Sequence, residues 1–282
     1  MPNPPAAALP SHPNGPDAAF AKVPAVTLGF WITKIFATTL GETAGDTVTM
    51  SWLGETTSAA TGWGYLIGTG LLIVPLLVLM AAQIRAARFH PLLYWATIIA
   101  STTAGTTLAD FFDRSLGIGY MGGTLVLLGC VLVSLVVWQR VLGSVAVASV
   151  ASPRAELFYW ITITFSQTLG TALGDWTADS FGDATVMGLE SGYVFGAVIF
   201  AAALGLVALA WRFTAWSRAG LFWAAFILTR PLGATVGDFL DKPLAKGGLD
   251  FSRPIASLAL LGAMVVCYVL LPQRAARAGA GH

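Results

Sequence analysis

A six-residue pattern occurs four times along this chain of 282 residues: a glycine, a small residue four positions later, and an aspartate directly after it. A tryptophan stands fifteen residues before each aspartate, and successive tryptophans are 63 to 65 residues apart. The copies of the pattern are Gly41–Asp46, Gly105–Asp110, Gly170–Asp175 and Gly233–Asp238, and the tryptophans are Trp31, Trp95, Trp160 and Trp223. An internal repeat of this length fixes the architecture. The fold is therefore expected to contain four copies of one unit.

The composition is that of a membrane protein. Hydrophobic residues make up 56% of the chain and charged residues only 10%, against about 25% charged residues in an average soluble domain. The net charge of +1 gives no indication of a nucleic-acid partner, and none is expected. Cys130 and Cys267 lie in apolar runs and are interpreted as small core residues, and no histidine lies inside such a run. No resident cofactor is expected.

Each repeat contains two segments long enough to cross a bilayer, which requires about 20 apolar residues. The first segment of each pair is rich in threonine and glycine and carries the aspartate motif, and the second is more apolar. The first segments are approximately 24–48, 91–112, 156–178 and 219–240, and the second are approximately 63–84, 119–139, 192–212 and 253–271. The sequence therefore predicts an all-α polytopic membrane protein with eight transmembrane helices. They form four tandem two-helix repeats in the same orientation, pseudo-symmetric about an axis along the membrane normal.

These segments divide the chain into three parts. A single transmembrane domain is expected over residues 23–272, and residues 1–22 are expected to be a disordered tail because they are rich in proline and alanine. Residues 273–282 form a short basic tail that is expected to be cytoplasmic. Within the domain the repeats are approximately 24–88, 89–152, 153–216 and 217–272.

The distribution of charge indicates the orientation. The connections between repeats are rich in arginine, whereas the connections within repeats are mostly acidic. Because basic residues favour the cytoplasmic side, both termini are predicted to be cytoplasmic, and the tryptophans are predicted to form an aromatic belt at that interface. Fifteen residues of helix advance about 22 Å, so each motif aspartate is predicted near the outer end of its helix.

Four-residue steps back from each aspartate trace a polar stripe, because positions i and i+4 share one face of a helix. The glycine and the small residue of each motif would let the helices approach closely. The stripes are Lys34, Thr38, Glu42, Asp46; Thr102, Thr106, Asp110; Gln167, Thr171, Asp175; and Arg230, Ala234, Asp238. Four such faces can converge into either a tight polar core or a narrow pathway.

Ionisable groups inside a membrane are costly and mark functional sites. The candidate ion-binding residues are Glu42, Asp46, Asp110, Asp175 and Asp238, with Glu42 and Asp46 as candidate metal ligands. The candidate electrostatic or gating residues are Lys34, Arg230, Gln167, Thr38 and Thr102, and a second acidic layer of Asp113, Asp179 and Asp241 is a candidate outer vestibule. Structural alternatives stay open: the aspartates could cap helices, Glu42 could pair with Lys34 or Arg230, and the second layer could be a solvated loop. Oxygen ligands without histidine or cysteine suit protons or hard cations such as Mn, Mg or Ca.

With these features the chain resembles a bacterial family of membrane-anchored proteins built from a two-span repeat of unknown function. The four tryptophans and the four Gly…Asp motifs carry the resemblance, which extends from about residue 24 to residue 271. It implies an integral protein of the bacterial inner membrane and supplies no substrate. A second similarity is to cation/proton exchangers, including manganese exporters, whose repeats carry a Glu-x-Gly-Asp signature followed by a base and Thr or Ser. Glu42–Thr47 is similar to it, but has one extra residue before the glycine and no base after the aspartate, and the other repeats lack the glutamate.

The leading hypothesis is a secondary transporter or exporter of a small cation, a divalent metal such as Mn, whose transport could be coupled to protons. The alternatives are a transporter of a small anionic or organic solute that uses Lys34 and Arg230, and a non-transporting membrane scaffold or sensor. The chain is not expected to be an enzyme, because it has no P-loop or dinucleotide fingerprint and no histidine placed for a catalytic triad. Its expected partners are the lipid bilayer and the cation, and a homo-oligomer is compatible with the sequence.

Overall fold

The computed structural model describes residues 20–150, 152–182, 185–186, 189–190 and 192–277. This part of the chain forms eight α-helices, and they agree with the eight predicted segments to within four residues at each end. The helices are α1 (Leu28–Asp46), α2 (Trp63–Arg85), α3 (Pro91–Asp110), α4 (Gly119–Leu142), α5 (Pro153–Ser180), α6 (Gly192–Phe213), α7 (Arg218–Asp241) and α8 (Arg253–Leu270). The all-α prediction is confirmed.

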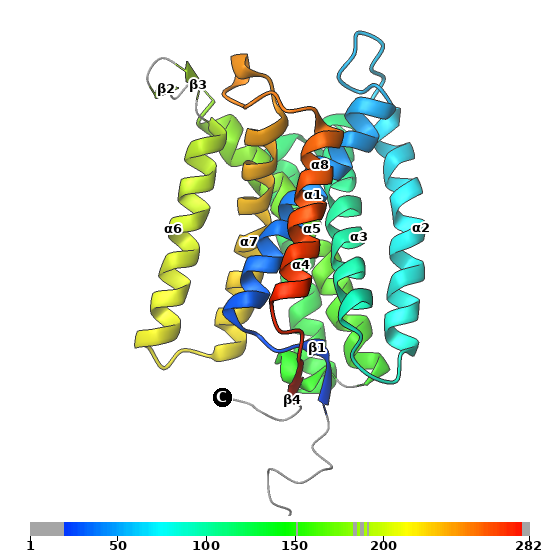
Figure 1. The fold of residues 1–282 in the computed structure, drawn as a ribbon, viewed down its shortest axis with the longest axis vertical. Helices are drawn as coiled ribbons and strands as arrows, with labels where there is room; N and C mark the ends of the chain where they lie inside the picture. The colour runs from blue at the N-terminus through cyan, green and yellow to red at the C-terminus, as the bar shows by residue number, and fades with distance from the viewer. Residues whose placement is uncertain (1–19, 151, 183–184, 187–188, 191, 278–282) are drawn as a thin grey trace, which may run out of the picture.

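The first helix of each repeat forms an inner ring. Helix α1 packs against α3, α3 against α5, α5 against α7, and α7 returns to α1, so the ring closes. The second helices lie outside it: α2 packs on α3, α4 on α5, α6 on α7, and α8 on α1 (Figure 1). Each outer helix therefore packs mainly on the inner helix of the next repeat, and α8 completes the circle by returning to the first one.

Polarity divides three of the four inner helices from the outer ones. Among the described helices, five are long and apolar enough to cross a membrane: α2, α4, α6, α7 and α8. Helices α1, α3 and α5 do not qualify, because all three are rich in threonine and α1 and α5 also contain several charged residues. They lie in the inner ring, where the outer helices pack around them. The chain is a polytopic helical membrane protein whose polar helices are on the inside.

Short elements complete the fold. Helices α1 and α3 continue directly into π-helical turns, η1 (Thr47–Trp52) and η2 (Phe111–Ser115), so Asp46 and Asp110 stand at α-to-π junctions. π-helical turns are rare in proteins as a whole, and many of those that occur are at functional sites. The other short elements are the 3₁₀ turns η3 (Val147–Ser149) and η4 (Leu244–Lys246), and the strands β1 (Phe20–Pro24), β2 (Thr185–Val186), β3 (Leu189–Glu190) and β4 (Ala275–Arg277).

The two ends of the described chain meet at one end of the bundle. Strand β1 pairs antiparallel with β4 (Figure 1), and the Lys22 ammonium lies 2.5 Å from Glu156 Oε1 of α5. The prediction of a disordered segment over residues 1–22 is therefore wrong for residues 20–22, because strand pairing and a buried ion pair fix them. Residues 1–19 lie outside the described residues. Residues 275–277 of the predicted C-terminal tail likewise form a strand.

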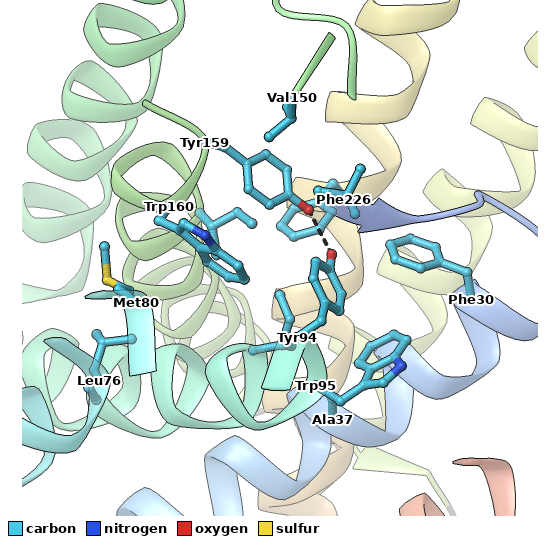
Figure 2. Packing of buried hydrophobic residues seen from close by; sticks show 14 of the residues in the cluster. Phe30, Ala37, Leu76, Met80, Tyr94, Trp95, Val150, Tyr159, Trp160 and Phe226 are labelled. Atoms are coloured by element: carbon cyan, nitrogen blue, oxygen red, sulfur yellow. Dashed lines mark hydrogen bonds between the residues drawn. The ribbon is translucent and has the colours of Figure 1, made fainter. Parts of the chain in front are cut away.

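An aromatic core closes the inner ring at this same end (Figure 2). In each repeat the residue directly before the motif tryptophan is aromatic, and it packs on the tryptophan of the next repeat. The pairs are Phe30–Trp95, Tyr94–Trp160, Tyr159–Trp223 and Phe222–Trp31, with ring centroids 5.6 to 6.1 Å apart. The hydroxyl groups of Tyr94 and Tyr159 are also hydrogen-bonded, 2.6 Å apart.

The aromatic-belt prediction is wrong for three of the four tryptophans, and Trp31 is partly buried against the same core. Trp95, Trp160 and Trp223 are buried in this core. Their indole groups also fix the polypeptide around them: Trp95 Nε1 donates to Gln273 Oε1 at 2.9 Å, and Trp223 Nε1 donates to the Val145 carbonyl at 3.0 Å. The reason is the circular packing, which places each tryptophan between two inner helices.

Candidate functional site

The motif glycines set the distance between the inner helices. Each one packs against the residue that stands eight positions before the aspartate of the next repeat, and a Cβ atom at any of them would clash or be tightly crowded. The contacts are Gly41 on Thr102, Gly105 on Gln167, Gly170 on Arg230 and Gly233 on Thr38. Small residues allow membrane helices to approach this closely. The close approach predicted from the motif is confirmed, and it brings the four polar stripes together.

Thr38 and Thr102 connect neighbouring inner helices. Thr38 Oγ1 donates to the Thr229 carbonyl of α7 at 3.1 Å, and Thr102 Oγ1 is 3.3 Å from the Ala37 carbonyl of α1. Both side chains are fully buried. These contacts are typical of threonine as a link between membrane helices, and they place both residues in the walls of the ring.

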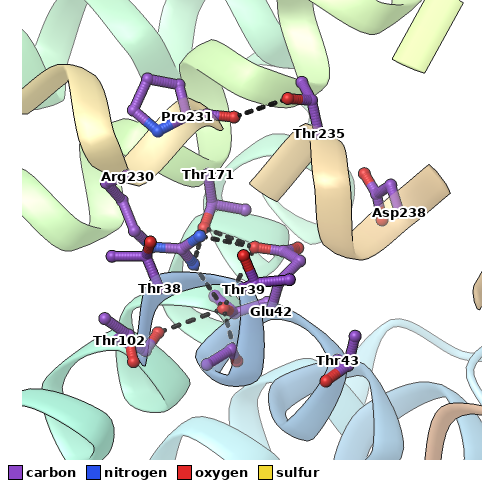
Figure 3. Close-up of polar contacts among 12 residues, drawn as sticks. Thr38, Thr39, Glu42, Thr43, Thr102, Thr171, Arg230, Pro231, Thr235 and Asp238 are labelled. Atoms are coloured by element: carbon purple, nitrogen blue, oxygen red, sulfur yellow. Dashed lines mark hydrogen bonds and ion pairs between the residues drawn. The ribbon is translucent and has the colours of Figure 1, made fainter. Parts of the chain in front are cut away.

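A buried ion pair crosses the centre of the ring (Figure 3). Arg230 Nη1 lies 2.8 Å from Glu42 Oε2, and Arg230 Nη2 donates to Thr106 Oγ1 at 2.6 Å and to Thr171 Oγ1. Both threonine hydroxyls lie 3.3 to 3.4 Å from the same carboxylate oxygen of Glu42. One residue from each inner helix therefore takes part, and the network holds α1, α3, α5 and α7 together. Of the two pairings that the sequence left open for Glu42, the structure has the one with Arg230.

Lys34 lies one helical turn beyond this network, toward the aromatic core. Its side chain is fully buried, and among the described residues its ammonium has no hydrogen-bond partner. The ammonium lies 3.7 Å from the centroid of the Phe226 ring. The amide of Gln167 is likewise buried and has no hydrogen-bond partner within the described part of the chain. Neither residue forms part of the ion-pair network.

The four motif aspartates form two bridged pairs. Arg114 Nε lies 2.6 Å from Asp110 Oδ1, and Arg114 Nη2 lies 3.4 Å from Asp175 Oδ2. Lys242 Nζ contacts Asp46 Oδ2 and lies 2.8 Å from Asp238 Oδ1. Each base therefore joins the aspartate of its own repeat to that of the next repeat. Asp46 and Asp110 make no side-chain capping hydrogen bond, which argues against the capping alternative for these two.

Sequence reasoning missed Arg114 and Lys242 as site residues. Each stands four positions after its motif aspartate, a spacing at which a base and an acid meet on a helix. The corresponding residues of the first and third repeats are Met50 and Asp179. The available signal was therefore the alternation at this position, where only the second and fourth repeats have a base. Each of these bases serves two neighbouring repeats.

One bridged pair is part of a larger carboxylate cluster. One oxygen each from Glu42, Asp46 and Asp238 lies within 4.8 Å of the other two, and all three side chains are buried. Asp46 Oδ1 is buried without a hydrogen-bond partner in the described structure. Of the five predicted ion-binding residues, these three are brought together, whereas Asp110 and Asp175 form the pair around Arg114.

A cavity of about 1010 Å³ lies at the aspartate end of the bundle. We call it the vestibule. Charged side chains of both signs contribute to its wall. They are Asp175, Asp179, Asp238, Asp241 and Asp250 on the acidic side and Arg114, Lys242, Lys246 and Arg253 on the basic side. Of the three predicted vestibule acids, Asp179 and Asp241 are in this lining.

Asp113 is the exception, and its assignment to the vestibule is wrong. Its carboxylate is directed against Gly123 of α4, and the side chain is largely buried. Burial, with a smaller contribution from nearby Asp110, raises the pKa of Asp113 to about 7.

The pKa of Lys242, just beyond the end of α7, depends on two opposing effects, burial and nearby charges. Burial alone would lower its pKa, but the carboxylates of Asp238, Asp46 and Asp241 outweigh that effect and raise it.

The fold and this site define a class: a polytopic helical membrane protein with a charged core inside a closed ring of four repeats. The family model described as a repeat of unknown function (DUF347) matches residues 29–89, 93–143, 158–216 and 221–274. The chain belongs to this family, and the resemblance seen in its sequence is confirmed. No curated protein and no solved structure matches the chain.

Proposed function

We propose that this protein is a secondary transporter of a small cation, with the cargo bound by Glu42, Asp46 and Asp238. The observation that carries the proposal is the convergence of these three carboxylates to within 4.8 Å at the foot of the vestibule. Asp238 lines the vestibule, and the other two lie behind it. Carboxylate oxygens are the ligands that hard cations such as Mn²⁺, Mg²⁺ and Ca²⁺ favour.

The local charges support a cation as the cargo. The ion pairs around the cluster join four carboxylates to three bases, which leaves one negative charge in excess. The carboxylates are those of Glu42, Asp46, Asp238 and Asp241, and the bases are Arg230, Lys242 and Arg253. A buried carboxylate oxygen without a hydrogen-bond partner, such as Asp46 Oδ1, is unfavourable in a low-dielectric surrounding. A bound cation would supply the missing positive charge.

The shape of the inner ring supports transport. The cluster faces the vestibule on one side, and the Arg230–Glu42 pair and the aromatic core close the ring on the other. Access to a central site from one side at a time is what a secondary transporter requires. From the family resemblance we further propose a bacterial inner membrane. From the arginine-rich connections between repeats we propose cytoplasmic termini and a vestibule that faces outward.

The alternatives receive less support. An anionic solute was expected to bind Lys34 and Arg230, but neither residue is in the described lining of the vestibule, and Arg230 is occupied by Glu42. A scaffold would have a polar stripe that packs without a cavity. The vestibule among the ends of the inner helices argues against that alternative.

The test measures Mn²⁺ uptake into proteoliposomes that contain the full chain. Asp46→Asn removes one charge from the cluster without changing its shape, and we expect transport to be lost. The matched control is Asp113→Asn, an equally conservative change of a buried acid that is directed toward α4, and we expect it to keep uptake near the wild-type rate. The assay is repeated with Mg²⁺ and Ca²⁺. The proposed function would be refuted if, for all three ions, vesicles with the wild type or with Asp46→Asn took up no more than protein-free vesicles.

A further inference from the structure

Lys242 occupies the carboxylate cluster in the manner of a bound cation. Its ammonium contacts Asp46 Oδ2, lies 2.8 Å from Asp238 Oδ1 and lies 3.7 Å from Asp241 Oδ1. Two of these three acids, Asp46 and Asp238, belong to the proposed cargo site. A cargo cation that bound them through the same oxygens would need the space that this ammonium fills.

In the second repeat the equivalent base is Arg114, and the chemical difference between arginine and lysine is informative. Arg114 contacts Asp110 through Nε and Asp175 through Nη2, so its planar group holds two helices at once. A guanidinium is a rigid fork of donors, whereas an ammonium is a compact, strongly hydrated charge on a flexible four-carbon stem. Of the two bases, Lys242 is therefore the one that can leave its partners and be hydrated elsewhere.

The surroundings of Lys242 provide a place for the displaced group. Lys242 itself lines the vestibule, and so do Asp241 and Asp250. Rotation of the side chain away from Asp46 would bring the ammonium into this water-accessible space, still close to acidic groups. No proton has to be transferred, because the ammonium keeps its charge throughout.

We propose that Lys242 is a tethered counter-ion that holds the cargo site between Asp46 and Asp238 when the site is empty, and that a cargo cation binds by displacing it into the vestibule. This inference rests on the proposed function. It assigns two tasks to Lys242: it neutralises the empty cluster, and its return to Asp46 and Asp238 competes with the cargo and promotes release. Arg114 remains in place as a fixed bridge between Asp110 and Asp175.

The experiment compares Lys242→Met with Arg114→Met in the purified full chain, with Mn²⁺ as the probe and calorimetry as the measurement. Removal of an internal competitor should tighten Mn²⁺ binding about tenfold or more, within the usual range of coupling between sites. Arg114→Met should leave the affinity unchanged or weaken it. Unchanged or weaker binding in Lys242→Met, or equal tightening in both variants, would overturn the inference.

A second variant keeps the test decisive if Lys242→Met does not fold. Lys242→Arg preserves the charge and the ion pairs but replaces the mobile ammonium with a rigid fork, so we expect Mn²⁺ binding to weaken about tenfold. Wild-type affinity in Lys242→Arg would contradict displacement. Failure of the inference is distinct from failure of the proposed function: Mn²⁺ transport that Asp46→Asn abolishes and that neither Lys242 variant alters would refute only the counter-ion role.

Discussion

The inner ring has two halves that share the same four helices and differ in nearly every other respect. At the aspartate end, charged residues surround a cavity of about 1010 Å³, and two bases hold four aspartates in pairs. At the other end, four aromatic residues and four tryptophans pack in a circle. The Arg230–Glu42 pair lies between the two halves.

The difference shows which features come from the repeat and which come from its variation. The glycine contacts and the aromatic circle use equivalent residues in all four repeats, so they build a symmetric scaffold. The charges do not: Glu42 occurs only in the first repeat, Arg230 only in the fourth, and the bases four positions after the aspartate only in the second and fourth. The aromatic end is closed and packs in the same way in all four repeats, whereas the aspartate end is open and its charges differ between repeats. We infer that the repeats form a rigid frame and that this frame carries one asymmetric site.

The largest loss of stability is expected from Arg230→Met, which removes the ion pair between the two ends of the ring. Without the guanidinium, Glu42 would be a buried carboxylate without its cation, so we expect a loss of about 3–5 kcal/mol in the free energy of unfolding. Denaturation of the purified protein in mixed micelles would measure it. Both halves should loosen, because the network joins all four inner helices.

A double variant provides the control for Arg230. Glu42→Gln together with Arg230→Gln leaves neutral amides at both positions, and we expect the pair of changes to cost less than Arg230→Met alone. With the single variants Glu42→Gln and Arg230→Gln, the non-additivity measures the interaction between the two side chains. A double variant that is no more stable than the single one would mean that the ion pair is not what closes the ring.

A smaller effect is expected from Gly170→Ala, which tests the scaffold. The new Cβ would collide with the Arg230 side chain and lie 3.1 Å from Pro231 Cδ. Overpacking of a tight core costs about 1–3 kcal/mol. Gly205→Ala on the outer face of α6 is the matched control, because nothing lies within 4 Å of its added Cβ. We expect that change to be neutral or stabilising by up to about 1 kcal/mol. Equal stability of the two variants would contradict the role of the motif glycines.

The sequence predicted the helices and the glycine contacts of the scaffold well because both depend on period, whereas it assigned the tryptophans of the aromatic circle wrongly to an interfacial belt. Helical spacing of the stripe residues and the small residues of each motif were enough to predict that the inner helices meet through their polar faces. Periodicity also predicted the eight helices, because each apolar segment has the length that a bilayer requires. The equivalence of the four copies indicated that their polar faces can converge, but not which helices pack on which.

The sequence predicted the site less well because the site depends on which of several neighbours each charge meets. Stripe spacing placed Glu42 near both Lys34 and Arg230 but could not decide between them. Arg114 and Lys242 were overlooked because they follow the motif and were assigned to the connections after the helices. The helical backbone in fact continues past both aspartates, as the turn η2 after Asp110 and as the end of α7 after Asp238. Asp113 has the same spacing from its motif aspartate as Asp241, yet Gly123 leaves space for its carboxylate on the α4 side.

The smallest expected effect has the opposite sign and concerns Lys34, the charged residue between the ion pair and the aromatic core. Its ammonium has no hydrogen-bond partner among the described residues and contacts the Phe226 ring. Lys34→Met keeps the length of the side chain, gives up a cation–π contact of about 0.5–2 kcal/mol and removes the larger cost of an unpaired buried charge. We therefore expect a gain of about 1 kcal/mol in stability, measured in the same micelles. Ile98→Met, at the equivalent position of the second repeat, should instead cost less than about 1.5 kcal/mol. A clear loss of stability in Lys34→Met would show that the closed half needs this charge, and the boundary between the two halves would then lie at Lys34 and not at Arg230.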